Sequence, residues 1–262
     1  MEENQTKKVL PVFYIIKSAV VASWNQSAYL TKSLFIMTTS LVFIQILYDI
    51  QPTTNIAKPI VIAKIVIQSV IYTLFAITCH RIILLGPNSV SIYGVLKWSK
   101  REWQFIRFGL IVAFFFILIY IVGLVLFFMS YYVFPILSNN KVGTIVSFTA
   151  MTLASLYMIS RLCVLFPATA IDKKIGVNTA LDLTIGNGWR LVVVFTAFPL
   201  VSSLFIAFLT GKHLLIDIIV YYLSYALIAV EISALSLSYK YLVETDEDKV
   251  NELELNSNNY NS

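Results

Sequence analysis

The stretch RIILLGP at residues 81–87 and the stretch RLCVLFP at residues 161–167 share one pattern, Arg-x-x-x-Leu-x-Pro, 80 positions apart. Each closes a long hydrophobic run and opens a polar segment that leads to the next hydrophobic run. Proline ends a helix readily because it has no backbone N–H to donate. The repeated pattern therefore indicates a duplicated unit built from helical hairpins in a membrane.

The composition of the chain points to the same class of protein. Hydrophobic residues make up 58% of the 262 residues, charged residues make up 13%, and the mean hydropathy is +0.81. A soluble domain is about 45–50% apolar and about 25% charged, so a bilayer accommodates this excess better than one soluble core. The net charge of +5 does not indicate nucleic acid, because the basic residues lie between the hydrophobic runs. They predict contact with anionic lipid headgroups.

Six hydrophobic runs are long enough to cross about 30 Å of hydrocarbon at about 1.5 Å per residue. They cover residues 32–49, 60–84, 105–134, 142–166, 189–211 and 214–240. The sequence therefore predicts an all-α polytopic membrane protein with six transmembrane helices. Most prolines lie near the ends of these runs, but Pro199 lies inside the fifth run, where we expect a kink.

The six runs fall into three repeat-like units of similar length, at residues 11–86, 87–166 and 167–243. Each unit is predicted to be a surface segment followed by a hairpin of two spans. Residues 1–10 form an N-terminal tail. Residues 244–262 are acidic and then rich in Asn and Ser, so we expect a disordered tail there.

The three surface segments are expected to form short amphipathic helices in the headgroup plane, with irregular loops as the alternative. In the first segment, Phe13, Ile16, Val20 and Trp24 share one helical face. The middle segment has a poorer apolar stripe. Four tryptophans in or beside these segments are predicted to anchor the protein at the membrane interface. They are Trp24, Trp98, Trp103 and Trp189.

The distribution of basic residues predicts the orientation. Of the 19 Lys and Arg residues, only Lys58, Lys64, Lys141 and Lys212 belong to one side of the predicted membrane domain. The other fifteen belong to the opposite side, which is cytoplasmic by the positive-inside rule. Both termini are therefore predicted to be cytoplasmic.

No constellation of catalytic residues is recognisable in the sequence. His80 and His213 belong to opposite faces of the predicted membrane domain and cannot share a metal. A Gly-rich phosphate loop, a nucleophile elbow and an H-E-x-x-H motif are missing from the sequence. We therefore predict that the protein is not an enzyme and that it uses no cofactor or metal.

Glu231 is the charged residue that most needs a partner, because it lies well inside the sixth run and charges at membrane depth are costly. Arg161 and Arg81, near the cytoplasmic ends of the fourth and second runs, are the candidate partners. The pattern leaves three alternatives open. Glu231 forms a structural ion pair, belongs to a substrate or proton site, or is an unpaired protonated carboxyl group hydrogen-bonded to Ser or Tyr.

Three stretches carry a resemblance to known proteins: HRIILLG at residues 80–86, RLCVLFPA at 161–168 and TIGNGWRL at 184–191. Together they resemble a broad group of uncharacterised six-span bacterial inner-membrane proteins. They are also similar to the membrane domain attached to some glycerophosphodiester phosphodiesterases. The resemblance covers nearly the whole chain and implies a stand-alone membrane domain in a bacterial inner membrane. It implies no activity, because the acidic metal ligands and paired histidines of the phosphodiesterase domain are missing here.

Two functions follow as hypotheses. The first is a lipid-interacting protein or a scaffold or assembly component, whose partners are membrane lipids and other inner-membrane proteins and not nucleic acid. The second is a small-solute transporter that uses Glu231 with Arg81 and Arg161, since broken helices and buried charge mark transport sites.

Overall fold

The computed structural model describes residues 9–50, 58–95, 98–133, 141–210 and 213–260. Within these ranges the regular elements are helices, and the only strand-like pairing is an isolated bridge between Ser91 and Gly94. The predicted all-α class is confirmed.

Six helices in the described ranges are long and apolar enough to cross a membrane, as the hydrophobic runs predicted. The first two hairpins are α2 (Ser27–Ile50) with α3 (Lys58–Leu85), and α4 (Lys100–Val133) with α6 (Lys141–Leu162). The third consists of α9 (Gly188–Val192), the π-helical turn η2 (Val193–Ala197), α10 (Phe198–Leu209) and the returning α11 (Leu214–Tyr260). The chain is a polytopic α-helical membrane protein.

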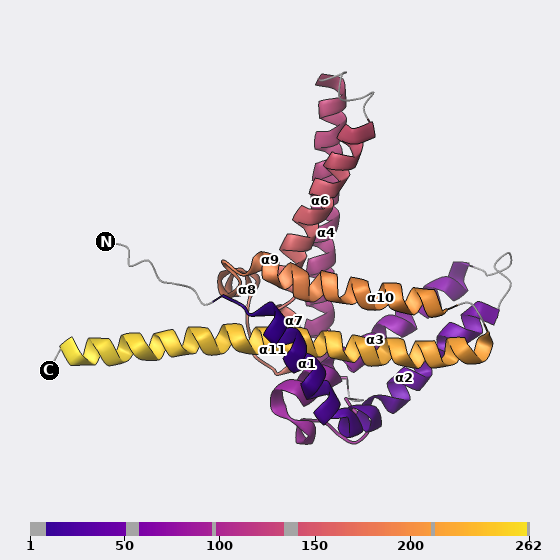
Figure 1. Cartoon of the computed structure of the whole chain (residues 1–262), viewed down its shortest axis with the longest axis horizontal. Coiled ribbons are helices and arrows are strands. Elements are labelled where there is room, and N and C mark those ends of the chain that lie inside the picture. The colour runs from indigo at the N-terminus through magenta and orange to yellow at the C-terminus, as the bar shows by residue number, and fades with distance from the viewer. Residues whose placement is uncertain (1–8, 51–57, 96–97, 134–140, 211–212, 261–262) are drawn as a thin grey trace.

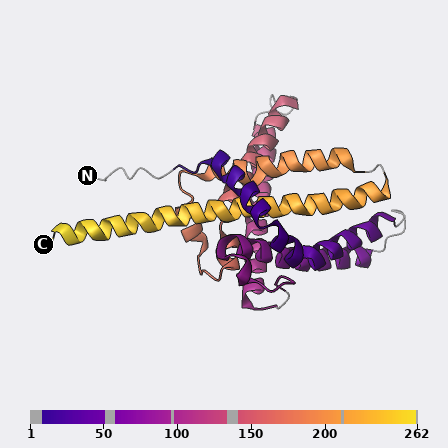
Figure 2. The same cartoon turned by 60° about the horizontal axis from the view of Figure 1, so that its bottom comes forward.

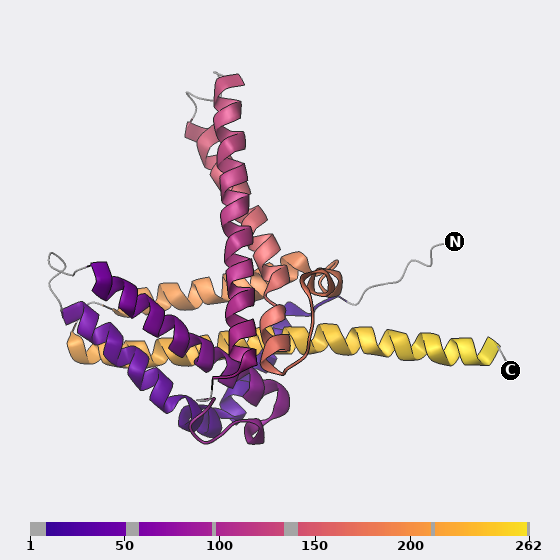
Figure 3. The ribbon, with the colours of Figure 1, turned by 180° about the vertical axis from the view of Figure 1, so that it is seen from behind.

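The helices form two groups. α2, α3, α10 and α11 run in similar directions, whereas the α4–α6 hairpin points away from them (Figures 1 and 3). The hairpin also projects away from the other helices in the view that is turned by 60° about the horizontal axis (Figure 2). α11 is central, because it contacts α2, α3, α10 and the N-terminal helix α1 (Val12–Asn25).

Of the three clusters of buried apolar residues in the described part of the chain, the two larger ones hold these helices together. One lies where α1, the C-terminal end of α6 and the part of α11 around Tyr239 meet, and it includes Leu10, Leu162 and Tyr239. The other joins α2 and α3 to α11 through Leu41 and Phe75. Small buried residues of α11 allow neighbouring helices to approach closely, as in other helical membrane proteins. They are Ser233, Ala234, Ser236 and Ser238.

The first surface segment forms helix α1, as predicted. Ile15, Ala19 and Ser23 are buried and define the packed face of α1, and Ser23 Oγ donates a hydrogen bond of 2.9 Å to Ser233 Oγ on α11. Along the stripe predicted from the sequence, Phe13 is 90% exposed and Trp24 is 79% exposed. The apolar stripe therefore faces outward, and a narrower face formed by Ile15, Ala19 and Ser23 packs on the protein.

The prediction of a helix in the middle surface segment is wrong, and the irregular alternative is what the structure shows. A short 3-10 helix, η1 (Pro87–Ser89), is followed by turns. Gly86 and Gly94 have φ angles of 87° and 76°, which are left-handed conformations that L side chains rarely adopt. A Cβ added at Gly94 would lie 2.6 Å from the carbonyl oxygen of Ser33, so the chain passes close to α2 here.

The third surface segment contains two short helices, α7 (Leu165–Ala170) and α8 (Val177–Leu183). Pro167 lies in the first turn of α7, near the end of the candidate span Ile145–Ala170, and a proline is tolerated there because the first N–H groups of a helix have no intrahelical acceptor. Asp172, in the turn between the two helices, has a φ of 63°.

The prediction of a disordered C-terminal tail differs from the structure. α11 continues as a helix from the membrane domain to Tyr260, and Figure 1 shows this extension running away from the other helices. Glu252, Leu253, Glu254 and Leu255 are of types that favour helix, and extending an existing helix needs no new nucleus. Residues 1–8 of the predicted N-terminal tail lie outside the described part of the chain.

Candidate functional site

Glu231 occupies the middle of the last span. The apolar part of α11 runs over Leu214–Glu244, and Glu231 is two residues from its midpoint. At about 1.5 Å per residue, the carboxylate-bearing residue lies about 20 Å along the helix from the Glu244 end and about 25 Å from the Leu214 end. A carboxyl group at this depth needs a partner or a polar cavity.

The partner that the structure gives to Glu231 is a serine. Ser202 Oγ on α10 donates a hydrogen bond of 2.6 Å to Glu231 Oε1. Among the described residues, no Lys, Arg or His nitrogen lies within ion-pair distance of the Glu231 carboxyl group. The hydrogen bond to serine that the third alternative predicted is thus present, the protonation state in that alternative stays a prediction, and the predicted ion pair with Arg81 or Arg161 is wrong.

Arg161 is engaged by its own surface segment instead. Its Nε donates to Thr184 Oγ1 at 3.0 Å, and its Nη2 donates to the carbonyl oxygen of Leu181. The last carbonyl groups of a helix lack intrahelical donors, so the end of α8 provides acceptors for a guanidinium group. The arginine therefore ties the end of α6 to the segment that follows it.

Arg81, at the end of α3, also donates hydrogen bonds to residues of the surface segments. Its Nε donates to the carbonyl oxygen of Ser89 at 3.3 Å, and its Nη1 donates to that of Ala170 at 3.0 Å and to Asp172 Oδ2 at 2.9 Å. The two arginines of the repeated motif therefore have equivalent structural roles. Neither reaches Glu231.

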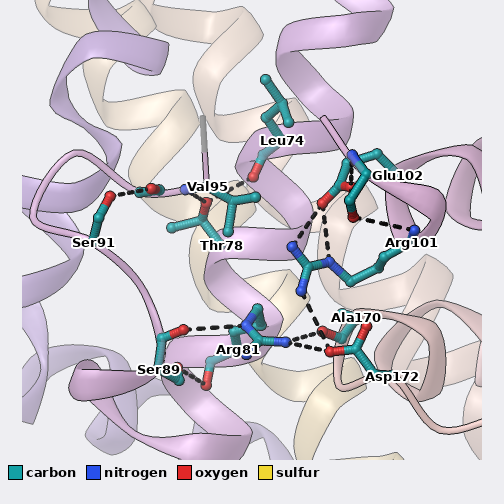
Figure 4. Close-up of polar contacts among 12 residues, drawn as sticks. Leu74, Thr78, Arg81, Ser89, Ser91, Val95, Arg101, Glu102, Ala170 and Asp172 are labelled. Carbon is teal, nitrogen blue, oxygen red and sulfur yellow. Dashed lines mark hydrogen bonds and ion pairs between the residues drawn. The ribbon is translucent and has the colours of Figure 1, made fainter. Parts of the chain in front are cut away.

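A cluster of charges surrounds Arg81 at the junction of α3, α4 and α7 (Figure 4). Arg101 pairs with Glu102 at 2.8 Å and with Asp172 at 3.4 Å, so Asp172 bridges two arginines. The Glu102 side chain is fully buried, whereas that of Asp172 is 59% exposed. We call Arg81, Arg101, Glu102 and Asp172 the charge cluster.

Sequence reasoning missed Glu102, Arg101 and Asp172 as members of this cluster, although one signal was present. Ser99 and Glu102 have the spacing of a capping box, in which serine precedes a helix and glutamate three residues later returns a hydrogen bond. In the structure the Ser99 N–H donates to Glu102 Oε2 at 2.6 Å. No comparable local signal marks Asp172.

Glu231 lines a hollow of about 540 Å³ between η2 and α10 on one side and α11 on the other. Ser202, Ser203, Ser224 and Thr196 supply the other polar side chains of its wall. The rest of the wall is apolar: Leu156, Phe195, Pro199, Leu200, Ile206, Ala207, Leu227 and Ile228. Neither Arg81 nor Arg161 lines it.

The helix that faces Glu231 is irregular next to this hollow. In η2 the Phe198 N–H donates to the carbonyl oxygen of Val193, five residues back, which is the π-helical pattern. Pro199 follows at the start of α10 and has no N–H for the preceding turn. The predicted irregularity at Pro199 therefore takes the form of a π-turn, a feature that often accompanies functional sites.

The four predicted interfacial tryptophans lie in or beside three surface elements. Trp24, Trp103 and Trp189 are exposed. The Trp98 ring packs edge-on against Trp103, with centroids 5.6 Å apart. Their role as interface anchors stays a prediction.

When the chain is compared with protein-family models, with curated proteins and with solved structures, nothing matches. The resemblance to six-span inner-membrane proteins therefore stays a prediction, and function has to be argued from the geometry.

Proposed function

We propose that the protein is a non-catalytic membrane component that interacts with lipids and serves as a scaffold or assembly partner for other membrane proteins. The observation that carries this proposal is the α4–α6 hairpin. From Ile106 to Val125 no residue of α4 is buried, and α6 is buried only from Ser155 onward among its described side chains. Most of the surface of the hairpin is thus free to contact other molecules.

The hairpin is well packed internally, which supports its use as a contact surface. Gly123 lies so close to Met151 that an added Cβ would be 2.6 Å from its side chain. Tyr120 and Thr152 hydroxyl groups lie 3.1 Å apart and share a hydrogen bond. Close approach at small residues and hydrogen bonds between helices are what stabilise helix pairs in membranes.

The outward face of α1 supports the lipid-interacting part of the proposal. Phe13, Val20 and Trp24 are exposed along it, and Lys17 is also exposed. Apolar and aromatic side chains with a nearby lysine are the chemistry of a helix that lies at a membrane surface with anionic lipids.

Photocrosslinking tests the scaffold proposal. A photoreactive amino acid at Ile117 or Ile121 on α4, which are 55% and 53% exposed, is expected to give a discrete protein adduct in native membranes. The matched control is Ile62 on α3, which is 61% exposed and is expected to give lipid adducts only. Identical products from the three positions would contradict the special role of the hairpin.

The alternative is a small-solute transporter, and the hollow beside Glu231 favours it. The site would use Glu231 without Arg81 and Arg161, since neither arginine lines the hollow. Glu231→Gln keeps the size of the side chain and an acceptor for Ser202. Normal abundance with loss of uptake or efflux of a solute would support transport and contradict a purely scaffolding role.

We further propose that the protein belongs to a bacterial inner membrane, with cytoplasmic termini, as the distribution of basic residues and the resemblance suggest. In a variant without Cys79 and Cys163, both of which are free and buried, single cysteines test this orientation. A cysteine at Gly176 should react with an impermeant reagent only after cells are opened, and one at His213 should react in intact cells. The reverse pattern would overturn it.

A further inference from the structure

We propose that the hollow beside Glu231 binds a hydrophobic organic cation, with an ammonium group at Glu231 and an apolar body along the wall formed by α10 and α11. The proposal names a ligand class for the hollow of the transport alternative. It concerns binding at equilibrium and does not require that the ligand be moved across a membrane.

The polar end of the hollow consists of groups that accept hydrogen bonds. Glu231 is the only charged residue among those that line it, and Ser202 is already bonded to its Oε1. The Oγ1 of Thr196 is buried and has no hydrogen-bond partner among the described residues. An ammonium group offers donors and the opposite charge to this set.

The surroundings of Glu231 determine which sign of charge a ligand of the hollow must carry. A carboxylate in an apolar surrounding attracts a cation strongly because the local dielectric is low, and each charge offsets part of the desolvation cost of the other. An anionic ligand would meet only repulsion, since the described residues that line the hollow include no base.

The size and walls of the hollow favour an organic cation over a bare metal ion. About 540 Å³ is within the range of about 300–1,000 Å³ that is usual for organic ligands. Phe195, Leu200, Ile206, Leu227 and Ile228 are among the apolar residues of its wall, which can contact a hydrocarbon body. A bare ion would leave most of this wall without contact.

The hollow is open on one side, which provides an entry path. Leu200, Ser203 and Ala207 line it and are exposed. They lie on α10 within a span, so the opening faces the region that lipid occupies in a membrane. An amphiphilic amine, which partitions into membranes through its apolar body, can enter by this route.

The test is equilibrium binding to the purified full-length protein in detergent, followed by saturation-transfer NMR with protein-free micelles as the blank. The probe is 4-phenylbutylammonium, and 4-phenylbutanol and 4-phenylbutyrate are neutral and anionic probes with the same apolar body. We expect saturable binding of the ammonium probe only. Glu231→Gln should weaken it at least tenfold, whereas Asp217→Asn, on the same helix but outside the wall, should leave it unchanged.

A second variant tests the same site without changing Glu231, so that a disturbed fold in Glu231→Gln is not mistaken for a loss of binding. Ser203→Trp fills the hollow from the exposed side of α10 without removing the carboxylate, and it should also abolish binding. Equal binding of the ammonium probe to the wild type and both variants would overturn the proposal, as would equal binding of the alcohol. If the ammonium probe binds as expected but no solute is transported, the site stands and the transport function fails. If transport depends on Glu231 but no ammonium probe binds, this ligand class is wrong and the transport function stands.

Discussion

The charge cluster around Arg81 and the hollow beside Glu231 both place carboxylates inside a mostly apolar protein, but these carboxylates have different partners at the two sites. Glu102 and Asp172 are paired with arginines, and the arginines also bond to backbone carbonyl groups. Among the described residues, Glu231 has the hydroxyl group of Ser202 as its hydrogen-bond partner, and it lies against an open hollow. The first arrangement uses charge to fix neighbouring segments, and the second leaves charge available for another molecule.

The position of each site along its helices explains part of this contrast. The cluster lies at the ends of α3 and α4, where carbonyl and N–H groups of helix termini need partners. Glu231 lies in the interior of a continuous helix, whose backbone groups bond to one another. Measurements of stability can therefore separate a structural carboxylate from an available one.

The largest loss of stability is expected for Glu102→Ala. The change removes the nearer of the two acidic partners of Arg101 and the acceptor of the Ser99 N–H at the start of α4. Breaking a buried pair on one side costs about 3 kcal/mol of the free energy of unfolding. Thermal unfolding in detergent measures the loss, with Asp182→Ala on exposed α8 surface as the control. A loss close to that of the control would show that the cluster does not stabilise the fold.

Arg81→Ala is expected to cost somewhat less, about 2 kcal/mol, because the carbonyl group of Ala170 loses a charged donor but Asp172 keeps Arg101. The variant Arg81→Lys tests whether positive charge alone accounts for this stabilisation. A single ammonium group cannot reach Ser89 and Ala170 together as the planar guanidinium does. The lysine variant should therefore recover only part of the stability, and full recovery would show that charge alone matters.

Glu231→Gln is expected to change the free energy of unfolding by less than about 1 kcal/mol, because the amide oxygen still accepts a hydrogen bond from Ser202. The same detergent unfolding assay checks it beside Glu102→Ala. If both variants lose similar stability, Glu231 is a structural residue and the contrast between the two sites is false.

The smallest effect is expected for Lys240→Ala on α11. Lys240 Nζ lies 3.6 Å from Glu244 Oε1, and both side chains are more than half exposed. Pairs of this kind on a helix contribute about 0.3 kcal/mol. The unfolding temperature should hardly change, at low or high salt. A loss comparable to that of Arg81→Ala would mean that this end of α11 has a further partner.

The sequence was sufficient to predict the six spans, because the length and apolarity of a span are local properties. The irregularity near Pro199 was predictable for the same reason. The partners of Arg81 and Arg161 were not, because they lie in surface segments whose placement depends on tertiary packing. The irregular middle segment was also missed, since the left-handed φ at Gly86 and Gly94 is visible only in the folded chain. The sequence singled out Glu231 as a charge deep within the sixth span, but its surroundings came from the structure.

The π-turn η2 makes the hollow dependent on chain length. An α-helix turns by about 100° for each residue, and a π-turn accommodates extra chain by widening locally. Inserting one further residue within Val193–Ala197, beyond the one that the π-turn already absorbs, would rotate α10 against the helix that precedes it. Ser202 and Ser203 would then leave the side that faces Glu231. A single codon gained within this turn would remove the proposed binding site while every residue that lines it after Ala197 remained in the gene.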